Sequence, residues 1–335
     1  MISLPKITDL DVSGKKVLLR ADLDVDFDTK TNNEDIRLKS IIPTLEYLVE
    51  KNSKVIIIGH RGRPGGKIDE KLSLEPVSKI VEKLLKEKIG EEKMKRVKME
   101  MLENLRFNPG EEANDGEFTK HLAGKGDIFI NEAFANSHRS HASIVGLPKL
   151  LPHAAGFRFT QEVENLSKVL NNPERPVIFI IGGAKKDKLD YLPLLKKIAD
   201  KVLVGGRLPA YAKISNKFLV ANLLPDKEDI TLNSIERFEE EIAKAGTIVL
   251  AGPMGRYEDK GHRQGTERIF KAVAESSAFK VVGGGDGLVV LQLFNLMDKF
   301  DWISVGGGAM LEFLAKRSLP GIKALESVKV NIEGG

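Results

Sequence analysis

The sequence predicts an α/β protein made of two Rossmann-like domains, each a parallel sheet flanked by helices. Short β-branched runs alternate with amphipathic stretches along the chain, as expected of parallel strands joined by helical crossovers. The 335 residues suit about two domains. Hydrophobic residues make up 41% and charged residues 30%, which is typical of a globular protein.

The predicted strands are apolar runs of strand length. They lie at residues 17–19, 55–58, 128–130, 177–181, 202–204, 248–250, 280–282 and 303–305. Helical spacing predicts helices over 74–85, where Ser73 is a candidate cap, and over 309–316. The basic run at 86–98 is interpreted as a solvated helical face rather than a binding patch.

The domain boundary is predicted between residues 162 and 176. Residues 162–170 have a helical pattern, which Pro173 and Pro176 interrupt. We therefore expect four parts: an N-terminal domain over 1–160, a hinge helix over 161–175, a C-terminal domain over 176–320 and a terminal segment over 321–335.

The bulk composition argues against several classes of protein. A net charge of +4 does not indicate nucleic-acid binding, and no apolar run is long enough to cross a membrane. The absence of cysteine excludes disulfides and thiolate zinc sites. The N-terminus lacks the pattern of a secretion signal, so we expect a cytoplasmic protein.

Cationic residues follow the predicted strands of the first half. They are Arg20, Arg37, His60, Arg63, Arg106, His138, Arg139 and His141. Each arginine alone is better explained by a surface salt bridge. Their repetition at strand ends favours one site for a multiply charged anion, because a guanidinium fork binds phosphate or carboxylate oxygens in pairs.

Glycines follow every predicted strand of the second half. They occur at 182–183, 205–206, 252 and 255, 283–285 and 306–308. Each pair could simply make a tight turn. Five sets at one sheet edge favour a nucleotide site, since glycine lets main-chain amides approach a ligand and a helix N-terminus binds anions.

Common nucleotide and metal motifs are missing from the sequence. It contains no Gly-x-x-x-x-Gly-Lys-Ser/Thr, which excludes a P-loop enzyme. It contains no Gly-x-Gly-x-x-Gly with a downstream acid, which weakens the alternative of a dinucleotide-dependent dehydrogenase. It also has no His-Glu-x-x-His motif for zinc.

Eight motifs in the same order resemble the phosphoglycerate kinase family. They span residues 17–24, 59–64, 102–107, 131–143, 182–188, 252–258, 283–286 and 304–314. The resemblance implies an N-terminal domain that binds 3-phosphoglycerate and a C-terminal domain that binds ATP or ADP with Mg²⁺. It also implies that the terminal segment returns to the first domain. We expect a monomer whose partners are small molecules.

The resemblance also implies roles for individual residues. The acid-substrate site would comprise Asp22, Asp24, Arg37, His60, Arg63, Arg106 and Arg139. The nucleotide site would comprise Gly183, Ala184, Lys185, Lys188, Gly206, Pro253, Glu258, Gly283, Gly284, Gly285, Asp286 and Gly287. Arg37, Lys185, Lys188, Gly285 and Gly308 would act on the transferring phosphoryl group, and Asp286 would accompany Mg²⁺.

Several positions depart from the family pattern. Asp24 replaces an asparagine, while Gly287 and Val305 replace threonines. The lysine motif is one residue short, so Lys186 stays an alternative to Lys188. Arg207 and Pro209 are unusual after the second glycine pair, and the segment between Gly206 and Gly252 is short, which leaves base preference open.

Reversible phosphoryl transfer between 1,3-bisphosphoglycerate and ADP is the function that the resemblance implies. Such transfer depends on positioning and charge neutralisation. The departures leave a second hypothesis, a diverged binding protein that keeps both pockets without turnover.

Overall fold

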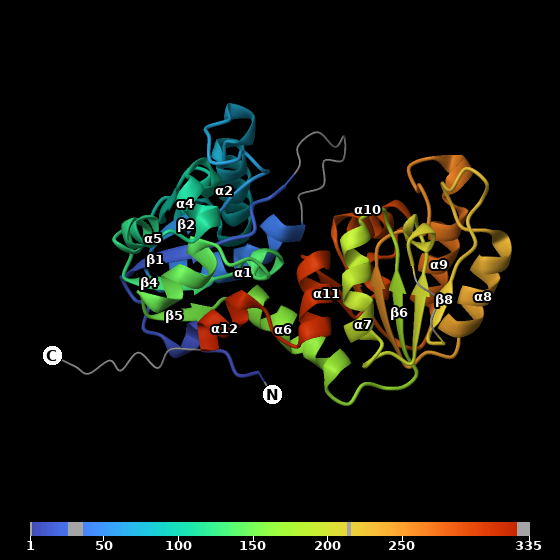
Figure 1. The fold of residues 1–335 in the computed structure, drawn as a ribbon. Helices are drawn as coiled ribbons and strands as arrows, with labels where there is room; N and C mark the ends of the chain where they lie inside the picture. The colour runs from blue at the N-terminus through green and yellow to red at the C-terminus, as the bar shows by residue number, and fades with distance from the viewer. Residues whose placement is uncertain (1, 26–35, 213–215, 327–335) are drawn as a thin grey trace. The chain divides into compact units, whose positions relative to one another are not determined.

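The computed structural model describes residues 2–25, 36–212 and 216–326, which form two compact units (Figure 1). Unit 1 comprises residues 1–163 and 319–335, and unit 2 comprises 164–318. Helix α6 (Phe157–Leu170) runs across the division between them. The final helix, α12 (Pro320–Glu326), belongs to unit 1, where it contacts the strand β5 (His153–Ala155).

Unit 1 contains one sheet of five parallel strands in the order β3-β2-β1-β4-β5. Its remaining strands are β1 (Lys16–Arg20), β2 (Lys54–Ile58), β3 (Lys98–Met101) and β4 (Ile128–Asn131). The strand order reverses direction between β1 and β4. Ligands of open α/β sheets bind beyond the carboxyl ends of the strands at such a point.

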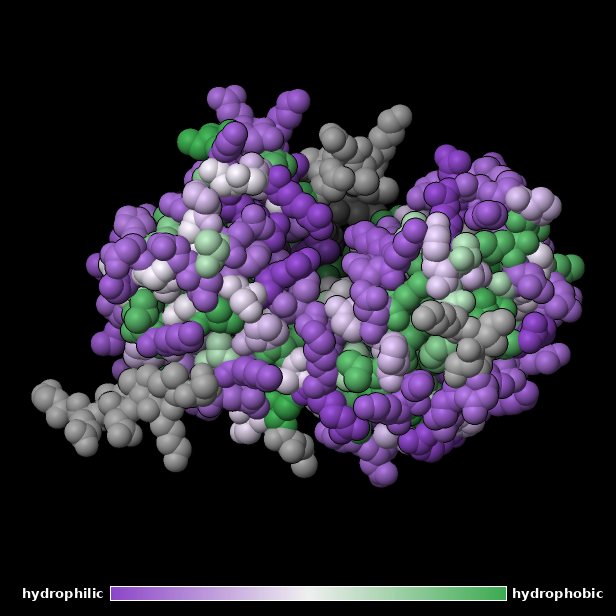
Figure 2. Space-filling model, viewed as in Figure 1, coloured by the Kyte–Doolittle hydropathy of each residue, from purple (hydrophilic) through white to green (hydrophobic). Residues whose placement is uncertain are grey.

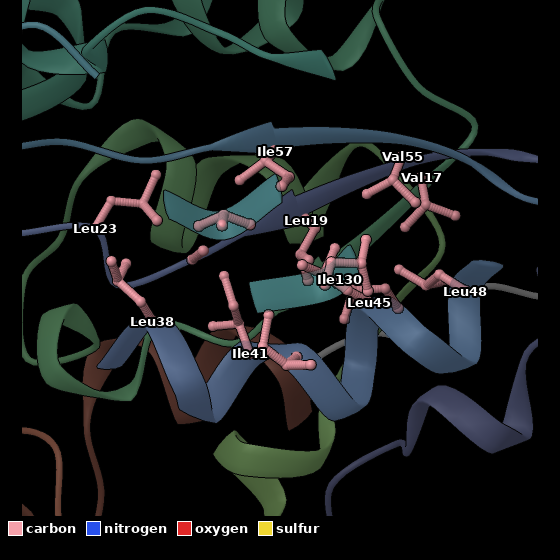
Figure 3. Packing of buried hydrophobic residues seen from close by; sticks show 14 of the residues in the cluster. Val17, Leu19, Leu23, Leu38, Ile41, Leu45, Leu48, Val55, Ile57 and Ile130 are labelled. Atoms are coloured by element: carbon pink, nitrogen blue, oxygen red, sulfur yellow. The ribbon is translucent and has the colours of Figure 1, made fainter. Parts of the chain in front are cut away.

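The core of unit 1 lies between this sheet and the helices α1 (Ile36–Glu50) and α2 (Glu75–Ile89). Figure 3 shows the α1 side chains Leu38, Ile41, Leu45 and Leu48 directed toward the strands. Their helical spacing places them on one face, and each buried leucine or isoleucine contributes roughly 1.5–3 kcal/mol. This packing fixes the N-terminal turn of α1, which carries Arg37.

Shorter helices complete unit 1. They are α3 (Glu91–Met94), α4 (Pro109–Ala113), α5 (Gly116–Ala123) and a π-helix (Ala142–Gly146). The sequence suggested that the basic run at 86–98 forms one helical face. The structure instead divides it between the end of α2, α3 and the start of β3. Helix α2 ends at Ile89 because Gly90 adopts a φ of +83°, and Lys98 begins an edge strand.

Unit 2 contains one sheet of six parallel strands in the order β11-β10-β9-β6-β7-β8. They are β6 (Val177–Ile181), β7 (Lys201–Val204), β8 (Phe218–Val220), β9 (Thr247–Ala251), β10 (Phe279–Gly283) and β11 (Trp302–Ser304). This is the doubly wound order, and it reverses direction between β6 and β9.

Helices cover both faces of the second sheet. Helices α8 (Leu232–Ile242) and α9 (Gln264–Glu275) lie on one side, and α7 (Leu192–Leu195) and α11 (Gly307–Lys316) on the other (Figure 1). Helix α10 (Gly285–Leu293) contributes Val290 and Leu291 to the same core cluster as α8 and α9.

The structure confirms the predicted fold class of two parallel sheets flanked by helices. All the predicted strands form, whereas β3, β5 and β8 were not predicted. These three lie at sheet edges and have three or four residues. The sequences of β3 and β5 lack the continuous apolar run of a central strand, whereas β8 is an apolar run of three residues that the sequence analysis overlooked. Hydrophilic residues cover most of the visible face of each unit (Figure 2). None of the helices in the described ranges is long and apolar enough to cross a membrane.

Candidate active site

Asp22 joins two loops at the reversal point of the first sheet. Its carboxylate accepts a hydrogen bond from the Ala135 amide at 2.8 Å and another from the Asn136 side chain. Asp22 follows β1 and the other two residues follow β4, so this buried group ties the two loops together. Burial raises the pKa of Asp22, and the nearby Arg37 and Arg20 oppose that rise.

Arg20 lies fully buried beside His60. Its Nε donates to Ser143 Oγ at 2.8 Å, and its Nη2 lies 2.9 Å from His60 Nδ1. Because a guanidinium can only donate, Nδ1 accepts and the imidazole proton sits on Nε2. Burial, followed by Arg20 and Arg106, holds the pKa of His60 well below its usual value. His60 is therefore a neutral donor through Nε2.

Arg106 and His141 enlarge the same cationic cluster. Arg106 Nη1 donates to the Gly62 carbonyl at 2.8 Å, and its buried Nε makes no hydrogen bond within the described ranges. Burial and then Arg106, Arg20 and Arg139 lower the pKa of His141 to about 4. Burial first, and then the same guanidinium groups, lower the pKa of both histidines, so this part of unit 1 carries an excess of positive charge.

Asp24 and Arg37 organise the rim of this cluster. Asp24 Oδ1 accepts from the Gly62 amide at 2.8 Å, and Arg37 donates to the main-chain carbonyl of Asp24. The unusual carboxylate at position 24 therefore anchors the loop after β2. Arg63 and Arg139 have exposed side chains.

Ser143 and Glu111 hold Arg20 in place, and the sequence analysis predicted neither as a site residue. Glu111 is fully buried and accepts from Ser143 Oγ at 2.6 Å, which in turn accepts from Arg20. Glu111 lies on α4, between strands, so no strand-end rule marks it.

A cavity of about 400 Å³ lies beyond the reversal point of the second sheet. Its lining residues are Gly183, Ala184, Gly206, Arg207, Glu228, Pro253, Gly255, Arg256, Tyr257, Glu258 and Asp286. Its volume falls within the range of small-ligand sites. The sequence predicted six of these: Gly183, Ala184, Gly206, Pro253, Glu258 and Asp286.

Gly206 shows why glycine is needed in this lining. It has a φ of +62°, and a Cβ there would lie 2.4 Å from the Gly183 nitrogen. The Gly183 amide donates to the Pro253 carbonyl at 2.7 Å, so the turns after β6, β7 and β9 touch through main chain. No side chain larger than hydrogen fits between them.

The remaining predicted nucleotide residues lie outside the cavity lining. They are Lys185, Lys188, Gly283, Gly284, Gly285 and Gly287, and the same holds for Gly308. Gly285 and Gly308 lie in the first turns of α10 and α11, and a Cβ at either would meet nothing within 4 Å. Their main chain is therefore open to a ligand.

Three lysines of the first glycine motif lie in different environments. Lys188 Nζ donates to the Gly182 carbonyl at 2.7 Å and to the Ala251 carbonyl at 3.0 Å. Burial lowers the pKa of Lys188 to about 8, although Asp286 opposes this. Lys186 Nζ lies 3.6 Å from the centroid of the Tyr211 ring, and Lys185 is exposed. Only Lys188 lies beneath the glycine turns.

Asp286 is the residue that the sequence analysis predicted to accompany Mg²⁺. It belongs to the first turn of α10 and lines the cavity. In the part of the chain that the structure describes, no group of three His, Cys, Asp or Glu side chains could hold a metal ion. A single carboxylate suits Mg²⁺ that arrives with nucleotide phosphates, because Mg²⁺ commonly uses one or two carboxylates and takes its other ligands from phosphate and water.

A guanidinium-rich anion site in one unit and a glycine-lined cavity in the other are the parts of a two-domain phosphotransferase. The sequence matches the phosphoglycerate kinase family over residues 7–228 and 220–317. The phosphoglycerate kinase of Dictyoglomus turgidum is 37% identical over 96% of this chain and 98% of its own length. That of Rubrobacter xylanophilus is 35% identical over 95% and 97%.

Solved structures show the same similarity. The phosphoglycerate kinase of Coxiella burnetii has a TM-score of 0.77 at 30% identity and covers 97% of this chain and 99% of its own. That of Pyrococcus horikoshii has a TM-score of 0.82 at 28% identity, with coverages of 96% and 98%. The chain belongs to the phosphoglycerate kinase family. It is a phosphotransferase with a carboxyl group as acceptor and catalyses a reaction of glycolysis.

Proposed function

We propose that unit 1 binds 3-phosphoglycerate through its cationic cluster and that unit 2 binds ATP or ADP in its glycine-lined cavity. The observation that supports binding of the acid is the cluster of Arg20 and Arg106 beside His60 and His141, whose pKa values are lowered by burial and then by these guanidinium groups. An anionic substrate would relieve this excess of positive charge. His60, Arg63, Arg106 and Arg139 would bind the acid, with Asp22 and Asp24 positioning the loops.

Arg37 is the residue assigned to the transferring phosphoryl group. It lies in the first turn of α1, where its guanidinium already reaches the rim at Asp24. Phosphoryl transfer spreads charge over three oxygens, and a guanidinium fork stabilises that charge. The open amides near Gly285 and Gly308 would stabilise the same oxygens from unit 2.

Lys188 and Lys185 are assigned to the nucleotide phosphates. Lys188 would exchange its carbonyl partners Gly182 and Ala251 for phosphate oxygens, a move of one flexible side chain. Glu258 would bind the ribose, and Pro253 with Gly183, Ala184 and Gly206 would line the nucleoside. Asp286 would hold Mg²⁺ with the nucleotide, which supplies charge neutralisation at the phosphates.

Transfer also requires domain closure, because the acid site and the nucleotide cavity belong to different units. Closure excludes the water that would hydrolyse an acyl phosphate. We further propose a monomer that acts in the cytoplasm.

A coupled assay tests the assignment. The purified chain is incubated with ATP, Mg²⁺ and 3-phosphoglycerate, and 1,3-bisphosphoglycerate is detected by reduction with a coupling dehydrogenase. We expect turnover that requires all three components. Tight binding of both ligands without product would instead indicate a binding protein.

A further inference from the structure

An arginine–glutamate pair lines the cavity of unit 2 without an assigned role. Arg207 directly follows Gly206, and its Nη2 donates to Glu228 Oε1. The Arg207 side chain is 56% exposed and that of Glu228 is 23% exposed, so the pair lies at the cavity surface and Arg207 can change rotamer. The pair lies in the short segment between Gly206 and Gly252.

The main chain holds both members of the pair in place. The Arg207 amide donates to the Gly183 carbonyl at 3.0 Å, and the Arg256 amide donates to the Glu228 carbonyl at 2.8 Å. The Glu228 amide donates to Asp226 Oδ1 at 3.0 Å. The main chain of both residues is therefore fixed to the turns that form the cavity, so only rotation of the side chains remains when a ligand binds.

The Glu228 carboxylate can accept a further hydrogen bond. Its Oε2 is shielded from water and accepts no hydrogen bond from any residue of the described ranges. A shielded carboxylate oxygen without a donor costs free energy, and a ligand N–H in the cavity would recover it. Rotation of Arg207 would open this oxygen to the cavity.

The charges along the lining indicate which part of a nucleotide meets the pair. Asp286 marks the phosphate end, because it starts α10 and interacts with Lys188. The Arg207–Glu228 pair is neutral overall and offers no net charge to a polyphosphate. It offers a donor and an acceptor side by side, which match the edge of a base.

Guanine matches this edge better than adenine does. Its N1–H and 2-amino groups are two adjacent donors for one carboxylate, and its O6 and N7 are acceptors for a guanidinium. Adenine offers one amino group next to the acceptor N1, which a carboxylate repels. We propose that Arg207 and Glu228 read the base edge and that this chain binds guanine nucleotides at least as well as adenine nucleotides.

The proposal deepens the proposed nucleotide site and rests on it. Calorimetric titrations with GDP, IDP and ADP, each with Mg²⁺, test it without requiring turnover. We expect GDP to bind at least as tightly as ADP, and IDP to bind more weakly than GDP because it lacks the 2-amino group. Glu228→Gln should weaken GDP binding by roughly tenfold to a hundredfold, and it should not weaken ADP binding, because the amide no longer repels adenine N1.

A matched control is the Arg268–Glu239 pair, which joins α9 to α8 in the same unit and lies outside the cavity lining. Glu239→Gln should leave all three affinities unchanged. Arg207→Gln is a second variant in case Glu228→Gln fails to fold. It should lower the affinities for GDP and IDP by similar factors.

Three results would overturn the proposal: clearly tighter binding of ADP than of GDP by the wild type, equal weakening of both in Glu228→Gln, or no binding of any nucleotide. Guanine selectivity in these titrations, together with no product in the coupled assay run with ATP and again with GTP, would reject the kinase assignment and support base recognition by this pair. Failure of the guanine proposal and failure of the kinase assignment therefore give different results.

Discussion

The candidate sites of the two units are built from different parts of the chain. Unit 1 surrounds its site with buried charged side chains, and Arg20, His60 and Asp22 hold one another in place. Unit 2 brings main chain from three turns together, with Gly206 and Gly183 too close for any Cβ. A site made of side chains is damaged by removing atoms, whereas a site made of main chain is damaged by adding them.

Truncation of a side chain in unit 1 should give the largest effect. Arg37→Ala is expected to lower kcat on the order of 10³-fold, because one guanidinium is lost from the charge of the transition state. Circular dichroism should remain unchanged, since Arg37 lies outside the core. Arg37→Lys keeps the positive charge but loses the forked pair of donors, so its kcat should lie between those of the wild type and Arg37→Ala. Unchanged kcat in Arg37→Ala would remove this residue from its role.

Addition of one carbon in unit 2 should give the next largest effect. Gly206→Ala is expected to lower the free energy of unfolding by about 2–4 kcal/mol, through its left-handed backbone and its contact with Gly183. Nucleotide affinity should fall as well, measured by titration with ADP. Gly14→Ala is the matched control, because Gly14 has a φ of +68° and nothing lies within 4 Å of its Cβ. Similar losses in both variants would show that the close approach of the turns is unimportant.

A buried carboxyl of unit 1 should make stability depend on pH. Glu132 accepts from the Phe159 amide at 2.8 Å and from Thr44, and burial raises its pKa to about 7 from a usual value of 4.5. The folded state therefore binds a proton more tightly than the unfolded state. Its contribution to stability is complete below pH 4.5 and declines as the pH rises through 7, by about 1.4 kcal/mol per pKa unit.

Glu132→Gln should remove this decline, measured by denaturant unfolding between pH 5 and 8. Glu117, an exposed residue paired with Lys120, provides the control as Glu117→Gln. If stability still declines with rising pH in Glu132→Gln, another group is responsible for the decline.

A partly exposed histidine in unit 2 should give the smallest effect. His262 contacts Asp259 through Nδ1 at 2.7 Å and Asp226 through Nε2 at 2.9 Å, and these bonds raise its pKa; Arg256 and Asp229 are also nearby. The charged form contributes stability below pH 6.5, and this is lost as the pH rises through the folded pKa. His262→Asn should therefore lower Tm at pH 6 and leave it unchanged at pH 9. The change is small because exposed ion pairs are screened by solvent. An equal loss at both pH values would point to packing instead.

The sequence alone determined the fold class and the candidate site residues expected beyond the carboxyl ends of the strands. Apolar runs such as 177–181 are long and β-branched enough to identify central strands. The segments after these runs contain cations in one half of the chain and glycines in the other. These properties are local, so neighbouring residues suffice to predict them. The edge strands β3 and β5 have no such run and depend on pairing with a neighbour, so they could not be predicted in this way, whereas the short apolar run of β8 was overlooked.

Only the tertiary structure decided which of these residues meet. Glu111 lies far from Arg20 in sequence yet stabilises it through Ser143, and Lys188, rather than Lys186, lies beneath the glycine turns. The pairing of Arg207 with Glu228 likewise depends on how two separate turns pack. Long-range contacts of this kind arise when strands distant in sequence become neighbours in a sheet, and no local pattern records that order.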